Sequence, residues 1–520
     1  MIFRSPHPDV EIPEIPLTDY VFENVEQFGD KPALIEGLTG RTLSYAQLHD
    51  SIRRVAAGLA RRGLKKGEVL AILSPNVPEY IVCFHAVASL GAVSTTVNPL
   101  YTVEEVGKQL RDARARFLVT VPQLLEKAQA AAEGTGVEEV FVFGEAEGAT
   151  PFSALLEGGE AALPEVEWKT REDLVALPYS SGTTGVCKGV MLTHHNLVAN
   201  LAQIKGSGHD WSGDNLICVL PLFHIYGLVA IANHGLRCGS TIVTLPRFDF
   251  EQVLRFMQDY RVSVAHIVPP VVLAMAKHPS VESFDLSALR MIFSGAAPLS
   301  ESLARACAER LGCEVVQGYG MTETSPATHL ASPSTNKHGS VGVCVPNMEC
   351  KVVDLETGAA LGTNEEGEIC VRGPQVMLGY LGRPDATAQT IDAEGWLHTG
   401  DIGYADEEGF FFIVDRAKEL IKYKGFQVAP AELEAVLLTH PSVADAAVIP
   451  VADDEAGEIP KAFVVTRADV SAEEVIAYVA ARVAPHKKIR RVEFIEQIPK
   501  SPSGKILRRL LVEKERAGTK

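Results

Sequence analysis

The segment from Tyr179 to Gly189, Tyr-Ser-Ser-Gly-Thr-Thr-Gly-Val-Cys-Lys-Gly, gathers glycines, hydroxyl side chains and a lysine between two apolar runs. Glycines let a backbone approach a ligand closely, and successive amide N–H groups in a turn form a concave anion site. Hydroxyls and a lysine ammonium add phosphate donors. The segment therefore predicts a phosphate-binding loop rather than a flexible linker. Its candidate ligands are Ser180, Ser181, Gly182, Thr183, Thr184, Gly185 and Lys188.

This phosphate loop (residues 179–189) does not match the loop of P-loop NTPases. That motif has Gly-Lys-Ser/Thr after a four-residue gap. Here Cys187 precedes the lysine and Gly189 follows it, so a P-loop NTPase is disfavoured.

Two further segments carry groups that suit a nucleotide. Residues 317–323, Gln-Gly-Tyr-Gly-Met-Thr-Glu, combine an aromatic ring, a hydroxyl and a carboxylate, which can stack on a base, form hydrogen bonds and bind Mg²⁺. Residues 395–401, Gly-Trp-Leu-His-Thr-Gly-Asp, end in Asp401, whose carboxylate can accept from two hydroxyls. Alternatively, Asp401 caps its own turn.

Four other segments place candidate groups on turns. Residues 221–227 carry His224 among aromatic residues, where a lone histidine is often structural. The small residues of 294–298 allow a flat ring to lie against the backbone, or simply form a tight turn. Residues 499–505 present Lys505 on a turn, and residues 418–427 are rich in lysine, which elsewhere indicates a solvated turn.

The composition is that of a globular protein with more than one domain. The 520 residues are too many for one core, and 46% are hydrophobic. The net charge of −18 argues against nucleic acid as the main partner. Residues 482–520 nevertheless carry twelve Lys or Arg against four Glu. We interpret this stretch as a face for a polyphosphate rather than as a solvated tail.

The cysteine pattern and the sequences at the two ends of the chain indicate the cellular compartment of the protein. The nine cysteines form no CxxC pair, which fits reduced thiols better than disulfides or a zinc site. No apolar run is long enough to span a membrane, and neither a secretory signal nor a peroxisomal address is visible. We therefore expect a cytoplasmic protein without a membrane span, and we predict no protein partner.

Short β-branched runs alternate with amphipathic helices before about residue 350. Ser44 and Gln47 predict a capping box at the start of one such helix. The alternation predicts an α/β fold with parallel sheets covered by helices. Strands are expected at 69–73, 117–120, 139–143, 216–220, 241–245, 263–268 and 291–293.

The pattern changes in the last third of the chain. Expected strands 349–353, 367–371 and 410–414, separated by glycine-rich turns, predict a smaller antiparallel sheet or distorted barrel. A boundary near Asp415 then gives an N-terminal domain, 1–415, and a C-terminal domain, 416–520. The latter is expected to be a compact α+β unit. Its expected elements are helix 431–438, strands 444–451 and 462–465, and a helix capped by Ser471 and Glu474.

These motifs together resemble those of the adenylate-forming superfamily, which includes acyl-CoA synthetases, luciferases and peptide-synthetase adenylation domains. Cys187 departs from the usual proline, which should loosen the phosphate loop without removing a ligand. The resemblance covers nearly the whole chain. It implies a large α/β N-terminal domain of parallel-rich sheets with a small antiparallel barrel-like subdomain, followed by a small mobile α+β C-terminal domain.

The resemblance also implies roles in binding Mg·ATP. Tyr319 would stack on adenine, Thr322 would contact the α-phosphate, and Glu323 with Thr184 would bind Mg²⁺. Asp401 and Arg416 would hold the ribose, and Asp415 would be the hinge. The implied ATP or AMP set is Ser180, Ser181, Gly182, Thr183, Thr184, Gly185, Lys188, Gln317, Gly318, Tyr319, Thr322, Asp401, Arg416, Lys418, Lys422 and Lys505.

Two groups of basic residues would serve different steps. By resemblance, Lys505 bridges the substrate carboxylate and the α-phosphate, where a cation offsets crowded negative charge. His224 would position the carboxylate. The implied catalytic set is Lys505, His224, Lys422 and Gln427, and the implied coenzyme A set is Arg247, Lys424 and Gly425.

Within the superfamily, residues 367–373 and 421–434 are most similar to 4-coumarate– or cinnamate–CoA ligases. Plant members often have lysine where this chain has Phe293. An apolar ring there would not favour a ring hydroxyl, so cinnamate is expected to rival 4-coumarate; plain core packing is the alternative role for Phe293. The implied acyl-binding set is Tyr226, Val229, His266, Phe293, Gly295, Ala296, Gly318, Gly320, Pro326, Ala327 and Thr328.

The implied reaction activates a small carboxylic acid with ATP, Mg²⁺ and coenzyme A. The acid would form an acyl-adenylate with release of pyrophosphate, and the coenzyme A thiol would then displace AMP. A medium- or long-chain fatty acyl-CoA ligase or a luciferase-like relative is an alternative. So is a non-catalytic nucleotide-binding protein, against which the joint presence of Lys188, Glu323, Asp401, Arg416 and Lys505 argues.

Overall fold

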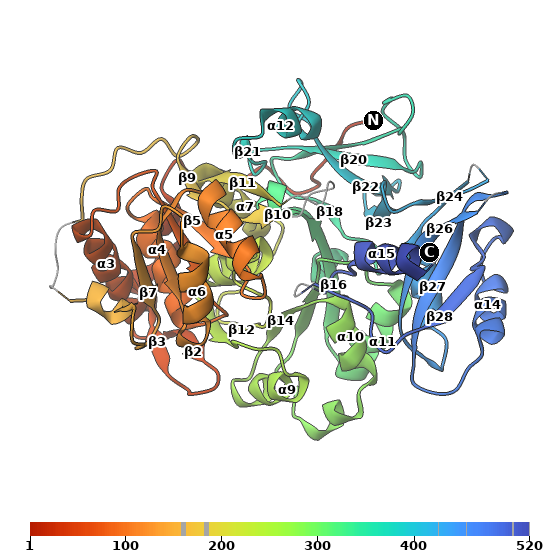
Figure 1. Ribbon diagram of the computed structural model, residues 1–520, viewed down its shortest axis with the longest axis horizontal. Helices are drawn as coiled ribbons and strands as arrows, with labels where there is room; N and C mark the ends of the chain where they lie inside the picture. Colours follow the sequence, from red (N-terminus) through yellow and green to blue (C-terminus); the bar gives the residue numbers. More distant parts are fainter. Residues whose placement is uncertain (158–162, 181–186, 425, 454, 502–503, 519–520) are drawn as a thin grey trace.

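The computed structural model describes residues 1–157, 163–180, 187–424, 426–453, 455–501 and 504–518. Two large sheets and a smaller antiparallel sheet form the body of the molecule, and a fourth sheet belongs to the C-terminal part of the chain. Figure 1 shows the two large sheets side by side and the C-terminal part at the opposite end from the first sheet.

The first large sheet has the order β10-β11-β9-β5-β4-β6-β7-β8, and β21 pairs with β11. Strands β5, β4, β6 and β7 are parallel. Along β4, Leu70 and Ile72 pack into one core while Ala71 and Leu73 pack into another. Burial on both faces explains the continuous apolar sequence of this strand. The strands are β4 (Val69–Leu73), β5 (Val93–Val97), β6 (Ala115–Thr120), β7 (Glu139–Val142), β8 (Thr150–Pro151), β9 (Leu174–Ala176), β10 (Tyr179–Ser180), β11 (Lys188–Thr193) and β21 (Gly379–Tyr380).

The second large sheet has the order β18-β17-β16-β15-β14-β12-β13-β2-β3. Its strands from β2 to β16 are parallel, and β17 and β18 continue it antiparallel. The strands are β2 (Pro32–Glu36), β3 (Thr42–Ser44), β12 (Asn215–Cys218), β13 (Thr241–Thr244), β14 (Val264–Ile267), β15 (Met291–Ser294), β16 (Glu314–Gly320), β17 (Ala327–Leu330) and β18 (Val343–Cys344). The ends of the seven strands expected between residues 69 and 293 lie within two residues of the prediction.

Helices separate and cover these sheets. One large apolar core contains residues of α3 (Tyr45–Arg61), α4 (Pro78–Ala88) and α7 (His194–Gly206) together with strands of both sheets. Helices α5 (Val103–Asp112) and α6 (Leu125–Ala132) cover the other face of the first sheet. The other face of the second sheet packs against α9 (Phe250–Asp259), α10 (Pro269–Lys277) and α11 (Glu301–Leu311). The capping box of Ser44 and Gln47 is confirmed at the start of α3.

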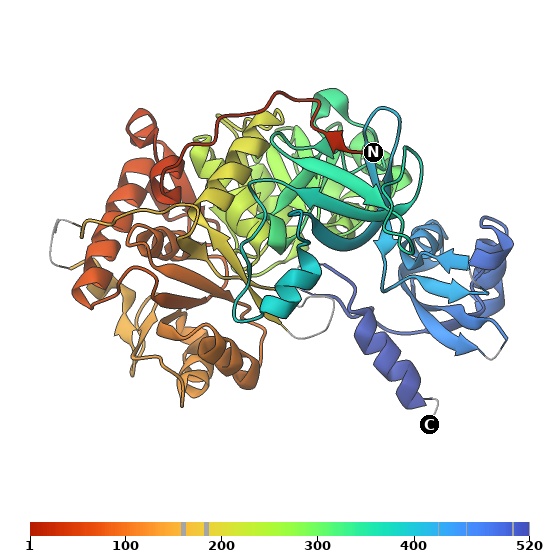
Figure 2. The ribbon, with the colours of Figure 1, turned by 90° about the horizontal axis from the view of Figure 1, so that it is seen from above.

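The smaller sheet is antiparallel, as expected, with the order β1-β19-β20-β22-β23. The N-terminal strand forms one edge, and the strand that leads into the C-terminal domain forms the other. Figure 2 shows that this sheet curls over the second large sheet. The strands are β1 (Phe3–Arg4), β19 (Glu349–Val353), β20 (Gly367–Arg372), β22 (Leu397–Ala405) and β23 (Phe411–Arg416).

The C-terminal sheet has the order β25-β24-β27-β26, with β28 beside β27. Helices cover both of its faces, because Ala446 and Val448 of β26 lie in one core while Ala447 and Ile449 pack near Leu511 of α15. The capping box of Ser471 and Glu474 is confirmed. The elements are β24 (Ile421–Tyr423), β25 (Phe426–Val428), α13 (Pro430–Leu438), β26 (Val443–Asp453), β27 (Gly457–Thr466), α14 (Ala472–Ala480), β28 (Arg491–Phe494) and α15 (Arg508–Gly518).

The predicted α/β class, with an antiparallel subdomain and a small α+β end, is therefore confirmed. The division at residue 415 stays a prediction, although the smaller sheet ends at Arg416 and the next sheet begins at Ile421. Among the helices of the described residues, none has the length and apolar character needed to cross a bilayer.

Candidate active site

The ends of the phosphate loop lie beside the predicted magnesium ligand. Ser180 Oγ donates to Glu323 Oε1 at 2.8 Å, and Tyr380 Oη donates to the same oxygen at 2.9 Å. The Lys188 ammonium lies 4.2 Å from the centroid of the Tyr380 ring. These contacts fix a buried carboxylate next to a buried lysine. The predicted ligands Ser181, Gly182, Thr183, Thr184 and Gly185 lie outside the described residues.

Glu323 offers hard oxygen ligands of the kind that Mg²⁺ prefers. It precedes Thr324 in a short 3₁₀ helix, Thr322–Thr324, directly after β16. This position brings the acid close to the residues of the predicted nucleotide site. The part of the site that the structure describes therefore fits a magnesium–triphosphate ligand.

Tyr319, Asp401 and Arg416 form a connected group. The phenol of Tyr319 donates to Asp401 Oδ2 at 2.6 Å, and Arg416 Nε lies 3.3 Å from Asp401 Oδ1. Asp401 and Arg416 are also directly paired across β22 and β23. Burial raises the pKa of Asp401, while the charge of Arg416 and the bond from Tyr319 act in the opposite direction. The structure thus assembles the three residues expected to bind adenine and ribose.

The turn between β15 and α11 closes the neighbouring part of this site. The Leu299 N–H donates to Gln317 Oε1 at 3.2 Å, which ties the turn to β16. A Cβ on Gly320 would come within 1.9 Å of the Pro326 carbonyl oxygen, so only glycine fits there. Gly318 lies in β16 beside Tyr319, and Thr322 begins the 3₁₀ helix that follows.

His224 is held in one orientation by the chain itself. The backbone N–H of Tyr226 donates to Nδ1 of His224 at 3.2 Å, so the neutral ring carries its proton on Nε2. Burial, and then the charge of Lys505, lower the pKa of His224 to about 3. A small cavity beside this ring is also lined by Phe223 and Thr322. The imidazole can therefore act as a neutral N–H donor toward an anion.

The predicted acyl pocket is an aromatic cluster. Tyr226 Oη and His266 Nδ1 are 3.2 Å apart, and the His266 and Phe293 rings stack with centroids 5.2 Å apart. A Cβ on Gly318 would come 2.6 Å from the Phe293 ring, and one on Gly295 would come 2.9 Å from Tyr226. The two rings therefore pack directly against these glycines, and a side chain at either glycine would displace a ring.

The other predicted acyl residues lie around this cluster. Val229 is buried in a π-helical segment, Tyr226–Asn233, and Ala296 has a positive φ of 71° in the turn after β15. Pro326, Ala327 and Thr328 lie at the start of β17. The Thr328 hydroxyl donates to the carbonyl of Tyr319 at 3.0 Å, which links the acyl side to the nucleotide side.

Sequence reasoning missed two members of the aromatic cluster. The Trp211 ring lies 4.6 Å from His266, and the His209 ring lies 5.5 Å from Phe293. Both residues follow α7, and no spacing in the sequence connects them with the predicted pocket. Tyr380 was also missed, since its contact with Glu323 depends on the pairing of β21 with β11.

Lys505 reaches the site from the C-terminal domain. A narrow turn carries it, in which Ser501 N–H donates to the Lys505 carbonyl at 2.8 Å and Gly504 has a φ of 78°. A Cβ on Gly504 would lie 3.0 Å from Val268, so the turn rests against the end of β14. Burial and the charge of Arg416 lower the pKa of Lys505, while Asp401 and Glu323 act to raise it.

The lysine-rich segment lies apart from this arrangement. Lys422 and Lys424 are exposed on the hairpin of β24 and β25, and Lys418 is exposed before it. Gly425 and the side chain of Gln427 lie outside the described residues, and Arg247 is exposed after β13. The structure therefore brings Lys505, and not the Lys422–Lys424 hairpin, to the nucleotide site.

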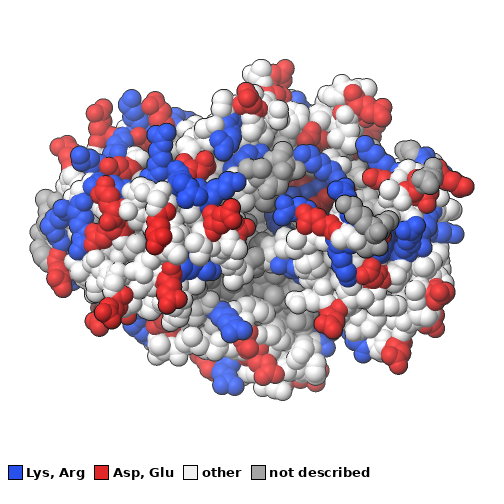
Figure 3. Space-filling view, in the orientation of Figure 1, with Lys and Arg blue, Asp and Glu red and all other residues white. Residues whose placement is uncertain are grey.

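Asp415 joins the two parts of the chain. Its Oδ1 accepts from Arg416 N–H at 2.7 Å, and its Oδ2 accepts from Ala431 N–H at 2.9 Å at the start of α13. A rotation of the C-terminal domain about Asp415 would have to keep or break these two hydrogen bonds. Figure 3 shows that Lys and Arg side chains gather along the rim of the hollow between the two parts, which suits a polyphosphate ligand.

Comparison with known proteins identifies the class. The model of the AMP-binding enzyme family matches residues 21–381, and that of the AMP-binding enzyme C-terminal domain matches residues 432–505. The chain belongs to the AMP-binding enzyme family, as the resemblance of its motifs predicted.

Among individual relatives, the chain is 47% identical to 4-coumarate-CoA ligase 1 of Narcissus pseudonarcissus, over 98% of this chain and 96% of the relative. It is also 47% identical to 4-coumarate--CoA ligase 1 of Petroselinum crispum, with the same coverage. Among solved structures, it is similar to the anthranilate CoA ligase AuaEII in complex with anthranoyl-AMP. That similarity has a TM-score of 0.88 and 26% identity, and it covers 97% and 98% of the two chains. ATP-bound MatB from Rhodopseudomonas palustris gives a TM-score of 0.87 at 30% identity, covering 97% and 100%.

Proposed function

We propose that this protein is an ATP-dependent acid–thiol ligase that converts 4-coumarate- or cinnamate-type acids into their coenzyme A thioesters. The observation that carries the proposal is the near-complete alignment, at 47% identity, with proteins named 4-coumarate–CoA ligase. The geometry adds support, because Lys505, His224 and Asp401 converge on one site from different parts of the chain.

In the first step the substrate carboxylate attacks the α-phosphorus of ATP, and pyrophosphate leaves. The Nε2–H of His224 would hold the carboxylate, and the ammonium of Lys505 would offset the negative charge that builds up between carboxylate and phosphate. No protein nucleophile is needed, since positioning and charge stabilisation suffice for such a transfer. Mg²⁺, when bound at Glu323 with Thr184, would neutralise part of the triphosphate charge.

Other residues of the proposed site would bind the base, the ribose and the phosphates of ATP. Tyr319 would stack on the base, while Asp401 and Arg416 would hold the ribose. Asp401 already accepts from the Tyr319 phenol at 2.6 Å, so the base and sugar positions are fixed relative to each other. Ser180 and Lys188 would contact phosphate oxygens.

In the second step the thiol of coenzyme A attacks the acyl carbonyl, and AMP leaves. Lys505 occupies the site in this structure, while the Lys422–Lys424 hairpin is exposed. We therefore assign the structure to the geometry of the first step. A rotation of residues 416–520 about Asp415 would withdraw Lys505 and bring Lys424 and Gly425 to the thiol channel, with Arg247 on its surface.

The aromatic walls support a planar acyl group. Tyr226, His266 and Phe293 pack against one another, and Phe293 and Tyr226 pack directly on Gly318 and Gly295, so aromatic rings and small residues make up the proposed acyl site. Flat rings pack well in edge-to-face and offset arrangements. Because Phe293 offers no polar group to a ring hydroxyl, we propose that cinnamate competes with 4-coumarate. We also propose that the protein acts in the cytoplasm.

A substrate panel tests the proposal. Purified protein would be assayed for acid-dependent exchange between ATP and pyrophosphate, and for thioester formation, with cinnamate, 4-coumarate and octanoate. We expect both activities with the two phenylpropanoid acids. Turnover only with octanoate would favour a fatty acyl-CoA ligase, and absence of exchange with any acid would refute ligase activity.

A further inference from the structure

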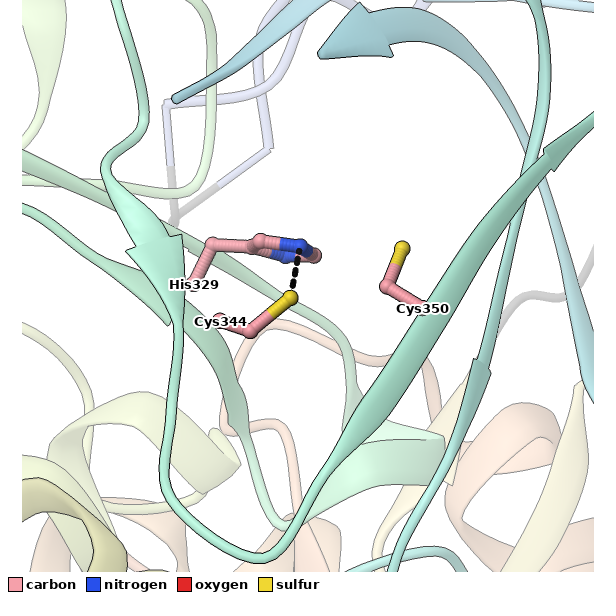
Figure 4. A group of neighbouring side chains, drawn as sticks. All are labelled: His329, Cys344 and Cys350. Carbon is pink, nitrogen blue, oxygen red and sulfur yellow. Dashed lines mark hydrogen bonds between the residues drawn. The ribbon is translucent and has the colours of Figure 1, made fainter. Parts of the chain in front are cut away.

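A second group of reactive side chains lies behind the nucleotide site and has no part in the reaction above. It consists of His329, Cys344 and Cys350, which we call the His-Cys-Cys cluster. Figure 4 shows His329 and Cys344 on two adjacent strands, with Cys350 facing them from a strand of the other sheet. Nε2 of His329 is 3.5 Å from Sγ of Cys344, and one ligand atom from each residue lies within 4.8 Å of the other two.

Strand pairing places the cluster. His329 of β17 is directly opposite Cys344 of β18, whereas Cys350 belongs to β19 of the smaller sheet. The cluster therefore bridges the second large sheet and the smaller sheet. All three side chains are buried, with at most 1% of each residue exposed. The three side chains therefore meet in the interior of the protein, between the two sheets.

The histidine is oriented as a ligand. The Thr328 hydroxyl donates to the Tyr319 carbonyl at 3.0 Å, so it can accept a hydrogen bond from Nδ1–H of His329, which is 3.0 Å away. This arrangement puts the ring proton on Nδ1 and leaves the lone pair of Nε2 directed at Cys344. Histidines that bind metals almost always donate their other N–H to an oxygen in this way.

We propose that His329, Cys344 and Cys350 form a binding site for a zinc ion. Zinc binds cysteine sulfur at about 2.3 Å and histidine nitrogen at about 2.0 Å, so the edges of its tetrahedron are about 3.5–3.8 Å long. The N–S separation of 3.5 Å between His329 and Cys344 is already close to such an edge. Three protein donors leave the fourth corner to a water molecule.

Charge balance favours zinc over a monovalent soft cation. Two thiolates and a neutral imidazole carry a charge of −2, which Zn²⁺ neutralises, whereas Cu⁺ would leave a buried negative charge. An uncompensated charge in such a site is costly. Thiolate and imidazole ligands also disfavour Mg²⁺, which prefers oxygen. Zinc binding would displace two thiol protons, so zinc affinity should rise with pH.

The simpler alternative is that Cys344 S–H donates to His329 and that Cys350 S–H donates weakly to the Lys351 carbonyl, 3.9 Å away. A zinc titration separates the two. Reduced, chelator-treated protein would be titrated with Zn²⁺ against a chromophoric competitor in excess Mg²⁺. We expect one tight zinc ion per chain, and a loss of more than about 100-fold in affinity in C344A and in C350A, because removing a group that merely supports a ligand already costs about 10- to 100-fold.

The matched controls are C307A and C370A. Cys307 is an equally buried thiol of α11, and Cys370 belongs to a separate group with Glu368 and His398. Both variants should keep the tight zinc ion. Unchanged zinc binding in C344A and C350A would overturn the proposal, and so would loss of binding in C370A alone.

Two measurements on the unaltered chain remain decisive if the variants do not fold. Co²⁺ should produce thiolate-to-metal charge-transfer absorption, and zinc should raise the melting temperature at constant Mg²⁺, since a ligand that binds only the folded state stabilises it. A cobalt spectrum without thiolate bands, or a Cys344–Cys350 disulfide that forms equally fast with zinc present, would contradict the site.

Discussion

The backbone N–H of Tyr226 donates a hydrogen bond to Nδ1 of His224 at 3.2 Å, and this contact decides which nitrogen of the imidazole faces the substrate. Nε2 must then carry the proton. H224A should lower the rate of adenylate formation by about 10²–10³-fold, the usual cost of removing one preorganised donor. Pre-steady-state release of pyrophosphate would measure this rate.

The lowered pKa of His224 determines how the rate of adenylate formation should depend on pH. The pKa of His224 falls to about 3 through burial and the nearby charge of Lys505. The ring thus stays neutral from pH 5 upward. We therefore expect that a plot of the adenylate-formation rate against pH has no inflection near pH 6.5 that is present in the unaltered protein and lost in H224A. Such an inflection would mean that the pKa of His224 is not lowered, and a rate that falls as the pH rises through the inflection would make the imidazolium the active form.

Lys505 should act in only one of the two steps. K505A removes the cation that faces Asp401 and Glu323. We expect adenylate formation to fall at least about 10²-fold, while thioester formation from supplied acyl-adenylate changes by only a few fold. The two half-reactions would be measured separately. K500A is the matched control, because Lys500 lies in the same turn but pairs with Asp445 at 2.6 Å. Equal loss of both half-reactions in K505A would refute the assignment.

The exposed hairpin should show the opposite behaviour. K424A would remove a cation proposed to contact coenzyme A in the second geometry. We expect the KM for coenzyme A to rise about tenfold, equivalent to about 1.4 kcal/mol, with no change in ATP–pyrophosphate exchange. Lys514 is another exposed lysine of this domain, so K514A is the control. An effect of K424A on exchange alone would place the hairpin in the first step.

Local features of the fold could be predicted from sequence alone. The capping boxes at Ser44 and Ser471 depend on residues three positions apart, and buried strands such as Val69–Leu73 appear as short apolar runs. These signals are short-range, so one sequence contains all the information that they need.

Long-range pairing could not be predicted in this way. The pairing of Leu34 with Ile242 and of Phe3 with Cys350 joins residues that no periodicity connects. The His-Cys-Cys cluster escaped notice for the same reason, because its members lie on separate strands without the CxxC spacing that usually indicates a zinc site. The roles of the nucleotide-, acyl- and coenzyme A-binding residues could be predicted from the family resemblance. The His-Cys-Cys cluster could not, because it is not part of the motifs that carry this resemblance.

Phe293 should control which acids are accepted. Its ring packs against Gly318 and stacks on His266, so F293L would open space in the pocket. We expect the ratio of kcat/KM for 4-coumarate to that for cinnamate to rise roughly tenfold, within the range that small changes in a hydrophobic pocket produce. In the unaltered protein, cinnamate should rival 4-coumarate. Ile292, the next residue of β15, faces the opposite core, so I292V is the control for stability alone. An unchanged ratio in F293L would assign Phe293 to core packing.

Buried histidines should make the protein sensitive to acid. Burial lowers the pKa of His209 to about 3, with nearby histidines adding to the effect. Between pH 6.5 and 3 the unfolded chain therefore binds a proton that the folded chain does not, and stability is lost as the pH falls through this window. Five further histidines have a pKa lowered to about 3 or 4 and add to the same trend, namely His85, His194, His224, His234 and His266.

A single substitution isolates this effect. H209F keeps an aromatic ring between Trp211 and Phe293 but cannot be protonated. It should therefore reduce the loss of unfolding free energy between pH 8 and pH 5 by about 2 kcal/mol, which is the linkage expected for a pKa of about 6.5 unfolded and about 3 folded. Urea unfolding at the two pH values would measure the difference. Parallel pH dependence in H209F and the unaltered chain would mean that His209 is protonated in the folded state.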